Sequence, residues 1–205
     1  MGTGHAIYLA RDALPPDYDG HLVVLYADNP GVDASLLQQL LAAHRDNERR
    51  YGRDRYGALI LTGSRRVAQS PGAAHYGRIV RGDADGGAAS ASGPVVDIVE
   101  KRQIDRLPAD DPRRHRLDAI DEYNSGIVVA RAQPYWRALG QARASPVSSG
   151  SYEYYATDFV KHMVSAGRVV QGWQIPADEQ YKLEGVNTVE ELQTLERKLD
   201  QRTRG

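Results

Sequence analysis

The stretch "LVVLYADNPGVDASLLQQLL" at residues 22–41 decides the fold class. Residues 22–27 form a continuous run of β-prone side chains, which is typical of a strand buried on both faces of a parallel sheet. A turn follows, and Asp33 is a suitable N-cap for a helix whose leucines at four positions between 36 and 41 form one apolar stripe. Strand, turn and helix are the basic unit of an α/β fold.

The alternation continues along the chain. Residues 56–63, "YGALILTG", predict a second strand, and the helix before it is long enough for a crossover between parallel neighbours. Further strands are expected at 76–82, 95–101, 126–132 and 169–175. Helices are expected at 134–142, at 157–167 with Thr157 as cap, and from Thr188, whose capping box with Glu191 starts a helix that turns Val189, Leu192, Leu195 and Leu199 inward.

Two segments interrupt the pattern of buried strands and helices. Residues 83–93, "DADGGAASASG", contain small residues and two aspartates, which indicates a flexible hairpin or loop. Residues 105–118 are broken by proline and highly charged, so we expect them at the surface.

Composition excludes several classes of protein. The 26 basic and 27 acidic residues nearly cancel, which argues against binding to nucleic acid or to an anionic membrane. There is no cysteine for a disulfide or a thiolate metal site, and no apolar run approaches the roughly 20 residues of a membrane helix. We expect a cytoplasmic protein with a single domain over residues 1–205.

Two polar residues lie beside predicted strands. Asp28 ends the first strand at the edge where open α/β sheets bind ligands, although it could equally close the turn with Asn29 and Pro30. Asn124, in "EYNSG", precedes a buried strand, and the simpler interpretation is a turn built by Asn-Ser-Gly.

Two more polar residues have the same double interpretation. Glu100 follows "DIV" and is either an ordinary edge charge or an inward carboxylate that binds sugar hydroxyls. Asn187 is either a turn residue or an oxygen ligand that holds Mg²⁺ beside Asp28.

Seven motifs in order resemble those of the sugar-1-phosphate nucleotidyltransferases, especially the uridylyltransferase domain of the bifunctional N-acetylglucosamine-1-phosphate uridylyltransferase. The motifs are "GTGHA" at 2–6, "VLYAD" at 24–28, "YGRIVR" at 76–81, "IVEK" at 98–101, "YNSGI" at 123–127, "EYYATD" at 153–158 and "EGVN" at 184–187. They span nearly the whole chain.

The resemblance implies a Rossmann-like, three-layer α/β/α nucleotidyltransferase domain with a mixed, mainly parallel sheet. It also implies a Mg²⁺-dependent reaction in which a nucleoside triphosphate, expected to be UTP, and a sugar 1-phosphate such as N-acetylglucosamine 1-phosphate give a nucleotide sugar and pyrophosphate.

The resemblance also implies roles for individual residues. Gly2 and Thr3 match the loop that holds the nucleotide, whereas Asp28 and Asn187 match the catalytic pair that holds Mg²⁺. The residues that match the lining of the sugar and its phosphate are Tyr26, Gly77, Glu100, Asn124, Tyr155 and Thr157.

One family element has no counterpart in these 205 residues. The family grips the triphosphate with an N-terminal strand and a Gly-rich loop that carries an arginine and a lysine, and this sequence begins at the motif that follows them. We therefore expect an N-terminally truncated sheet, with the strand before Asp28 exposed to a partner chain or a second copy. No hexapeptide repeat follows Asn187, so no β-helix acyltransferase domain is expected. The alternative function is a catalytically incomplete subunit that binds a sugar nucleotide or a partner.

Overall fold

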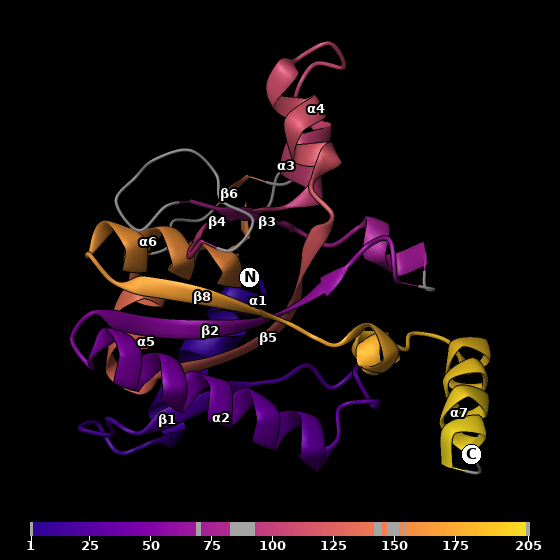
Figure 1. Ribbon diagram of the computed structural model, residues 1–205. Helices are drawn as coiled ribbons and strands as arrows, with labels where there is room; N and C mark the ends of the chain where they lie inside the picture. Colours follow the sequence, from indigo (N-terminus) through magenta and orange to yellow (C-terminus); the bar gives the residue numbers. More distant parts are fainter. Residues whose placement is uncertain are drawn as a thin grey trace.

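The structure, a computed structural model, describes residues 2–68, 71–82, 93–141, 145–146, 152–153 and 155–203. A six-stranded sheet forms the centre and carries helices on both sides (Figure 1). Its strands are β1 (His21–Val24), β2 (Tyr56–Ser64), β3 (Arg78–Arg81), β4 (Val95–Val99), β5 (Glu122–Arg131) and β8 (Val169–Gln174). The expected α/β fold class with a mixed sheet is confirmed. The expectation that this sheet is mainly parallel is wrong, because β2 with β8 is the one parallel pairing among its described strands.

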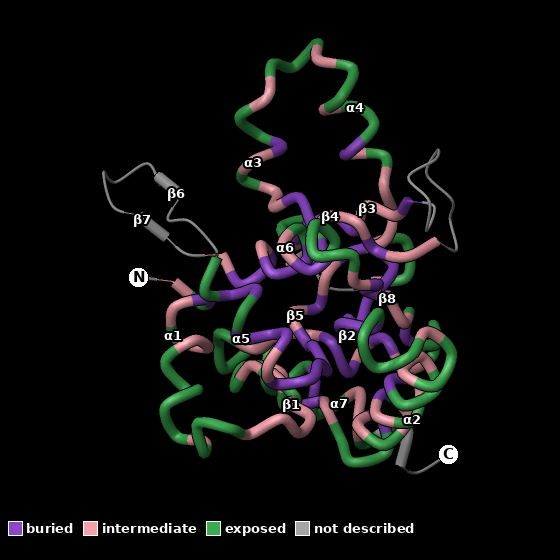
Figure 2. The backbone as a smooth tube through the Cα atoms, turned by 90° about the vertical axis from the view of Figure 1, so that its left-hand side faces the viewer, coloured by how far each residue is buried: buried purple, intermediate pink, exposed green. Residues whose placement is uncertain are grey.

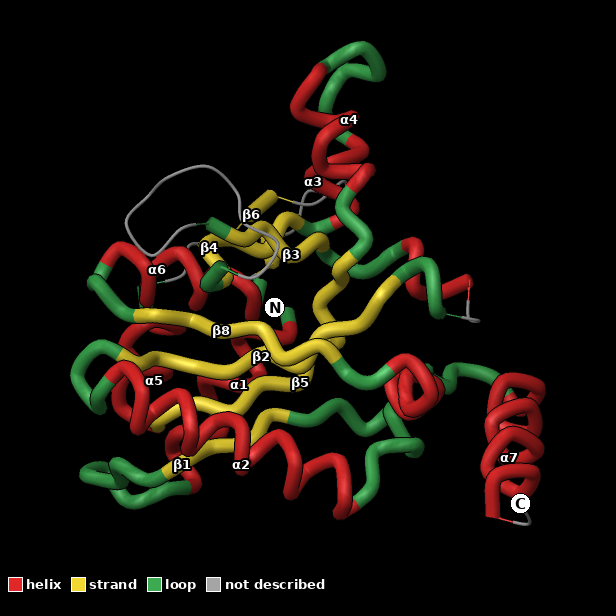
Figure 3. Tube along the Cα trace, in the orientation of Figure 1, coloured by secondary structure: helices red, strands yellow, loops and turns green. Residues whose placement is uncertain are grey.

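The helices are short apart from two. They are α1 (Thr3–Leu9), α2 (Ala34–Tyr51), α3 (Lys101–Asp105), α4 (Pro112–Ala119), α5 (Ala132–Gly140), α6 (Phe159–Ser165) and α7 (Val189–Thr203). Four 3-10 turns, η1 (Ala10–Ala13), η2 (Pro71–Ala74), η3 (Ala156–Asp158) and η4 (Ala177–Leu183), and a separate two-stranded ribbon of β6 (Ser145–Pro146) with β7 (Tyr152–Glu153) complete the described elements (Figure 3). No helix in the described ranges is long and apolar enough to cross a membrane.

The core lies on both faces of β2, every residue of which is buried. Because successive strand residues point to opposite faces, Ala58 and Ile60 pack with α5 and α6, whereas Leu59 and Leu61 pack with α2. Figure 2 shows the buried positions gathered in the sheet and its adjoining helices, while the segment bearing α3 and α4 projects with mostly exposed residues. The sheet therefore has helical layers on both faces, as the strand pattern predicts.

The strand order differs from the expected crossover between neighbours. The sheet runs β4-β3-β5-β2-β8, and β1 pairs with β5 as well. The pairings make β1, β2, β3 and β8 run one way and β4 and β5 the other, so β1 and β2 are parallel but have the antiparallel β5 between them. Sequence alone does not specify which later strand inserts between two parallel ones.

The long strand β5 has two different neighbours on the side away from β2. Tyr123 pairs with Arg78 of β3, whereas Val128 pairs with Val24 of β1. Residues 124–127 therefore lie between the end of β1 and the start of β3, and a register shift against β2 occurs there. This gap in the sheet is where the functional site lies.

The local expectations had different outcomes. The first strand is not buried on both faces, because β1 lies at an edge and Val23 is 39% exposed. The charged segment 105–118 lies at the surface as expected, because all its residues except Leu117 are exposed or half-buried. It contains α4, which has Pro112 in its first turn and Asp111 accepting a hydrogen bond from the Arg113 backbone N–H (2.7 Å). The loop expected at 83–93 lies, apart from its last residue, outside the described residues.

The C-terminal helix is placed differently from its predicted packing. Its capping box is confirmed, because Thr188 Oγ1 accepts from the Glu191 N–H and Glu191 Oε2 accepts from the Thr188 N–H, each at 3.2 Å. However, α7 projects from the sheet (Figure 1), so Leu195 is buried but Val189 is 65% exposed and Leu192 is also exposed. An amphipathic pattern predicts a helix but not the surface that covers it.

Candidate functional site

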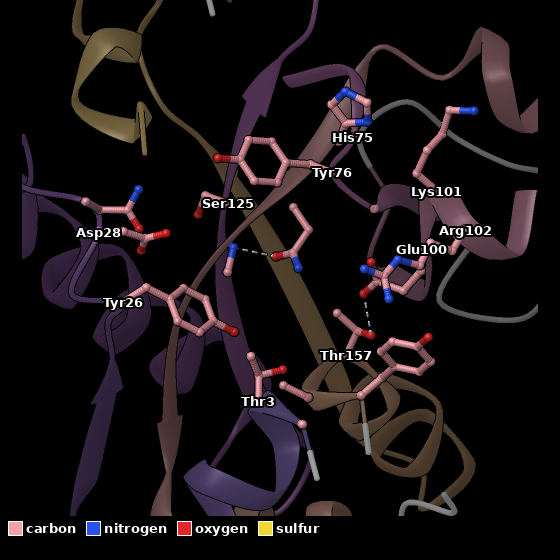
Figure 4. Close-up of a pocket in the computed structure, with 17 residues that line it drawn as sticks. Thr3, Tyr26, Asp28, His75, Tyr76, Glu100, Lys101, Arg102, Ser125 and Thr157 are labelled. Carbon is pink, nitrogen blue, oxygen red and sulfur yellow. Dashed lines mark hydrogen bonds between the residues drawn. The ribbon is translucent and has the colours of Figure 1, made fainter. Parts of the chain in front are cut away.

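A cavity of about 430 Å³ opens at the gap between β1 and β3. The sequence predicts ten site residues, which are called the marked residues below. Nine of them line this cavity: Gly2, Thr3, Tyr26, Asp28, Gly77, Glu100, Asn124, Tyr155 and Thr157. Figure 4 shows Tyr26 and Asp28 on one side of this cavity, with Glu100 and Thr157 on the other. Segments from across the chain therefore converge on one site.

The floor of the cavity is the irregular part of β5. Asn124 Oδ1 accepts a hydrogen bond from the Gly126 backbone N–H (3.0 Å), which is the turn that the simpler interpretation of "NSG" predicts. The Asn124 NH₂ group has no bond to another described residue, so its donors remain available at the cavity. The turn and a binding role are thus compatible.

Gly126 allows Tyr26 to pack against this turn. Its φ is +86°, and a Cβ at this position would lie 2.1 Å from Cε2 of the Tyr26 ring. Only glycine tolerates both the left-handed backbone and this approach. Burial raises the pKa of the Tyr26 hydroxyl, and a hydrogen bond with Thr3 opposes the rise.

Glu100 and Thr157 form the opposite wall. Thr157 Oγ1 donates to Glu100 Oε1 (2.8 Å), so this threonine does not cap a helix as predicted; α6 begins at Phe159 after the turn η3. Burial raises the pKa of the Glu100 carboxyl, and the hydrogen bond from Thr157 lowers it in part. The wall offers carboxylate oxygens and a hydroxyl to a polyhydroxylated ligand.

Gly77 connects the wall to the floor. Its carbonyl accepts from the Asn124 N–H (2.9 Å), and a Cβ on it would lie 3.3 Å from Glu100 Oε2. The next residue, Arg78, is fully buried and donates to the carbonyls of Ala74 and Tyr76. Arg78 therefore fixes the turn that lines the cavity, a role that its sequence position does not reveal.

Asn187 is the one marked residue that does not line the cavity. It is exposed, and its backbone N–H donates to Glu191 Oε2 (2.7 Å) at the start of α7. Its segment does pass Asp28, because the Val186 N–H donates to the Asp28 carbonyl (2.7 Å). The two predicted metal ligands are therefore on adjoining segments.

The donor set is consistent with a hard cation. The carboxylate of Asp28 and the amide oxygen of Asn187 are oxygen ligands, and Mg²⁺ commonly takes only one or two protein ligands together with substrate phosphates. Within the described ranges, no group of three or more His, Cys, Asp or Glu side chains is arranged to hold a metal.

Sequence reasoning missed other residues at the cavity. His75, Tyr76, Lys101, Arg102 and Ser125 also line it, and Figure 4 places the first four along one rim. Each of them lies one or two positions from a residue that the sequence predicted for the site, and this proximity is the signal that could have found them.

The two cations of this rim adjoin Glu100 in sequence. Lys101 is engaged elsewhere, because its Nζ donates to Asp105 and lies 3.8 Å from Asp118. The cavity thus has an acidic side at Asp28 and a mixed side at Glu100 and Arg102.

No protein-family model matches the chain. Comparison with known sequences finds relatives that carry the same name. The chain is 34% identical over 187 residues to the bifunctional protein GlmU of Nocardia farcinica, covering 91% of this chain and 31% of that protein. It is 35% identical over 197 residues to the bifunctional protein GlmU of Burkholderia orbicola, covering 96% of this chain and 35% of that protein. The chain spans about a third of the length of these relatives.

Solved structures share the fold. A CMP:2-keto-3-deoxy-manno-octonic acid synthetase complexed with CTP matches with a TM-score of 0.53 and 14% identity, over 97% of this chain and 68% of the other. A nucleoside-diphosphate-sugar pyrophosphorylase from Vibrio cholerae matches with a TM-score of 0.53 and 16% identity, over 96% of this chain and 65% of the other. The chain is therefore similar in sequence to about one third of the bifunctional protein GlmU, and it shares the fold of these solved structures.

Proposed function

We propose that this chain carries the site of a sugar-1-phosphate nucleotidyltransferase that moves a uridylyl group from UTP to a sugar 1-phosphate such as N-acetylglucosamine 1-phosphate. The products would be a nucleotide sugar and pyrophosphate. The observation that carries the proposal is the convergence of nine marked residues, from the N-terminus to residue 157, on one cavity.

The two sides of the cavity have different roles in this proposal. Gly2 and Thr3 border the nucleotide, next to Tyr26. Glu100 accepts hydrogen bonds from sugar hydroxyls and the Asn124 NH₂ group donates to the sugar, with Tyr155, Thr157 and Gly77 completing the sugar-phosphate side. This division follows the resemblance of the motifs, which groups Tyr26 with the sugar-phosphate residues, and all of these residues line the same cavity.

Asp28 and Asn187 would hold Mg²⁺ in this proposal. Their oxygen donors suit the ion, and the bond from Val186 to Asp28 keeps their segments together. When bound, the ion would supply charge stabilisation for the phosphoryl oxygens.

The chain's own contribution to the reaction is alignment. A phosphate oxygen of the sugar phosphate forms a bond to the α-phosphorus of UTP, and the bond from that phosphorus to pyrophosphate breaks. No covalent nucleophile is needed, because holding two reactants in line can by itself supply about 7–11 kcal/mol of the barrier. The rigid wall formed by Glu100, Thr157 and Gly77 suits that task.

Pyrophosphate release tests this function. The chain is mixed with UTP, Mg²⁺ and N-acetylglucosamine 1-phosphate, and Asp28→Asn is compared with Asp110→Asn, an exposed carboxylate on the projecting α3–α4 segment. The proposal is supported if Asp28→Asn lowers the rate of pyrophosphate release about a hundredfold and Asp110→Asn leaves that rate unchanged. No release with any combination of nucleoside triphosphate and sugar 1-phosphate would remove it for the isolated chain.

A second candidate is a subunit that binds a sugar nucleotide without turnover. The observation that favours it is that Lys101, which lines the cavity, donates its Nζ hydrogen bond to Asp105. Calorimetry with UDP-N-acetylglucosamine distinguishes it: binding without pyrophosphate release supports this candidate, and no heat of binding with or without Mg²⁺ contradicts it.

A further inference from the structure

Tyr76 lines the cavity of the candidate site, although the motifs assign it no role. Its ring stacks on Tyr123 of β5, with the ring centroids 5.1 Å apart and the ring planes at 16° to one another. Tyr123 is itself buried, at 2% exposure, so the stacked pair anchors the Tyr76 ring to the central sheet. The ring is therefore held in one orientation at the cavity.

The backbone on both sides of Tyr76 is fixed as well. The buried Arg78 donates to the carbonyls of Ala74 and Tyr76. The Gly77 carbonyl accepts from the Asn124 N–H (2.9 Å). Since both the ring and the chain that carries it are held in place, little further ordering is needed when a ligand contacts this side chain.

The Tyr76 hydroxyl faces the side of the cavity on which Asp28 lies (Figure 4). Gly185 shows how near the two groups come: a Cβ on that glycine would lie 3.4 Å from the Tyr76 hydroxyl oxygen and 3.7 Å from Asp28 Oδ2. Within the described residues, neither the hydroxyl nor the carboxylate has a hydrogen-bond partner. The two groups therefore border the same small space in front of Gly185.

Other hydroxyls at this cavity are already used by the fold. Ser125 Oγ donates to the Leu61 carbonyl (2.6 Å). Thr157 Oγ1 donates to Glu100 Oε1 (2.8 Å). The Tyr76 phenol is half-buried and protonated at neutral pH, so it has one hydrogen bond to donate. Because buried donors in proteins almost always find an acceptor, this donor suits a ligand atom that accepts at the same spot.

We propose that the Tyr76 hydroxyl donates a hydrogen bond to a phosphoryl oxygen of the bound nucleotide sugar. This inference rests on the proposed function, in which Glu100 and Asn124 meet the sugar and the Asp28 side meets the phosphoryl groups. Phosphoryl oxygens are charged acceptors, so they suit the phenol O–H, and a cation at Asp28 would offset the repulsion from its carboxylate. Tyr76 is thus a further binding residue for the same reaction.

Calorimetry on the full chain with UDP-N-acetylglucosamine and Mg²⁺ tests the inference. Tyr76→Phe keeps the stack on Tyr123 and removes only the hydroxyl, so the affinity for the nucleotide sugar should fall about tenfold or more. The thermal midpoint of this variant should not change, because its ring packing is kept.

Tyr123→Phe is the matched control, because it removes the other hydroxyl of the stacked pair. That hydroxyl lies toward Gly63, where an added Cβ would be 2.6 Å from it, and Tyr123 does not line the cavity. Its affinity for UDP-N-acetylglucosamine should equal that of the wild type. Uridine, which has no phosphoryl group, should bind equally to the wild type and to Tyr76→Phe.

Gly185→Ala probes the same space without removing the hydroxyl. The φ of Gly185 is not positive, so an alanine is tolerated, and its methyl group would stand between the Tyr76 hydroxyl and the Asp28 carboxylate. This variant should weaken the binding of UDP-N-acetylglucosamine to a similar extent.

The results that contradict the inference differ from those that contradict the proposed function. If the wild type and Tyr76→Phe bind UDP-N-acetylglucosamine equally, the inference is overturned and the proposed function stands. The same holds if Tyr76→Phe loses as much affinity for uridine as for the nucleotide sugar, because the hydroxyl would then not act on a phosphoryl group. If the wild type binds no UDP-N-acetylglucosamine, the proposed function and the inference fail together.

Discussion

A buried histidine that does not line the cavity makes the stability of the fold depend on pH. His44, on α2, is fully buried, and both of its ring nitrogens have partners. Its Nε2 lies 2.9 Å from His21 Nδ1, and its Nδ1 lies 3.2 Å from the Tyr56 hydroxyl. Neutral His44 can satisfy both contacts, with one nitrogen donating and the other accepting.

The cost of charging His44 sets the expected pH dependence. The pKa of His44 is lowered from 6.5 to about 4, chiefly by burial and also by His21 and Arg131, while Glu48 opposes the shift. Since the pKa is lower in the folded state, the unfolded chain binds the proton first as pH falls. The stabilisation is therefore complete above pH 6.5 and is lost between that value and about pH 4. Relative to pH 7, the loss at pH 5 is about 2 kcal/mol.

Urea denaturation at pH 7 and pH 5 measures this loss. The wild-type free energy of unfolding should fall by about 2 kcal/mol, and His44→Gln, which cannot titrate but retains an amide for hydrogen bonding, should change by less than about 0.5 kcal/mol. Carboxyl groups whose pKa is lowered, such as that of Asp33, titrate below this window. Equal losses in wild type and variant would refute the assignment to His44.

Three further predictions concern stability. Asp33→Ala removes the cap bond to the Leu36 N–H (2.8 Å) and should cost about 1 kcal/mol in urea denaturation; an unchanged midpoint would contradict the cap. Leu40→Ala deletes most of a fully buried side chain and should lower the free energy of unfolding by about 2–5 kcal/mol. A loss below about 1 kcal/mol would mean that neighbouring core side chains move in to fill the cavity left by the leucine. Gly126→Ala should cost at least about 1–2 kcal/mol, because φ is +86° and the new Cβ displaces Tyr26; a fully stable variant by thermal unfolding would show that this turn has another conformation.

The sequence predicted most elements because their signals were local. The cap at Asp33, the capping box from Thr188 to Glu191 and the apolar run of β2 are each determined within a few residues, and all three are present. The place of β5 between β1 and β2 was not predictable in this way, because it depends on pairing between distant segments.

The same distinction applies to the candidate site. Nine of the predicted site residues reach one cavity because most of them lie at or beside the end of a local element, and the fold brings these ends to the irregular part of β5 that carries Asn124. The prediction that Thr157 caps a helix was wrong, because its hydroxyl donates a hydrogen bond to Glu100, which lies in another part of the sequence. Arg78 was missed because full burial of an arginine at the start of a strand has no sequence signature.

The insertion of β5 between β1 and β2 has a consequence for synthesis. Val24 pairs with Val128, so β1 leaves the ribosome long before its sheet neighbour exists. Pairings between distant segments form slowly, and apolar strands are prone to aggregation as long as they remain unpaired. The segment that bears β1 therefore needs protection from aggregation until residues 122–131 have been synthesised.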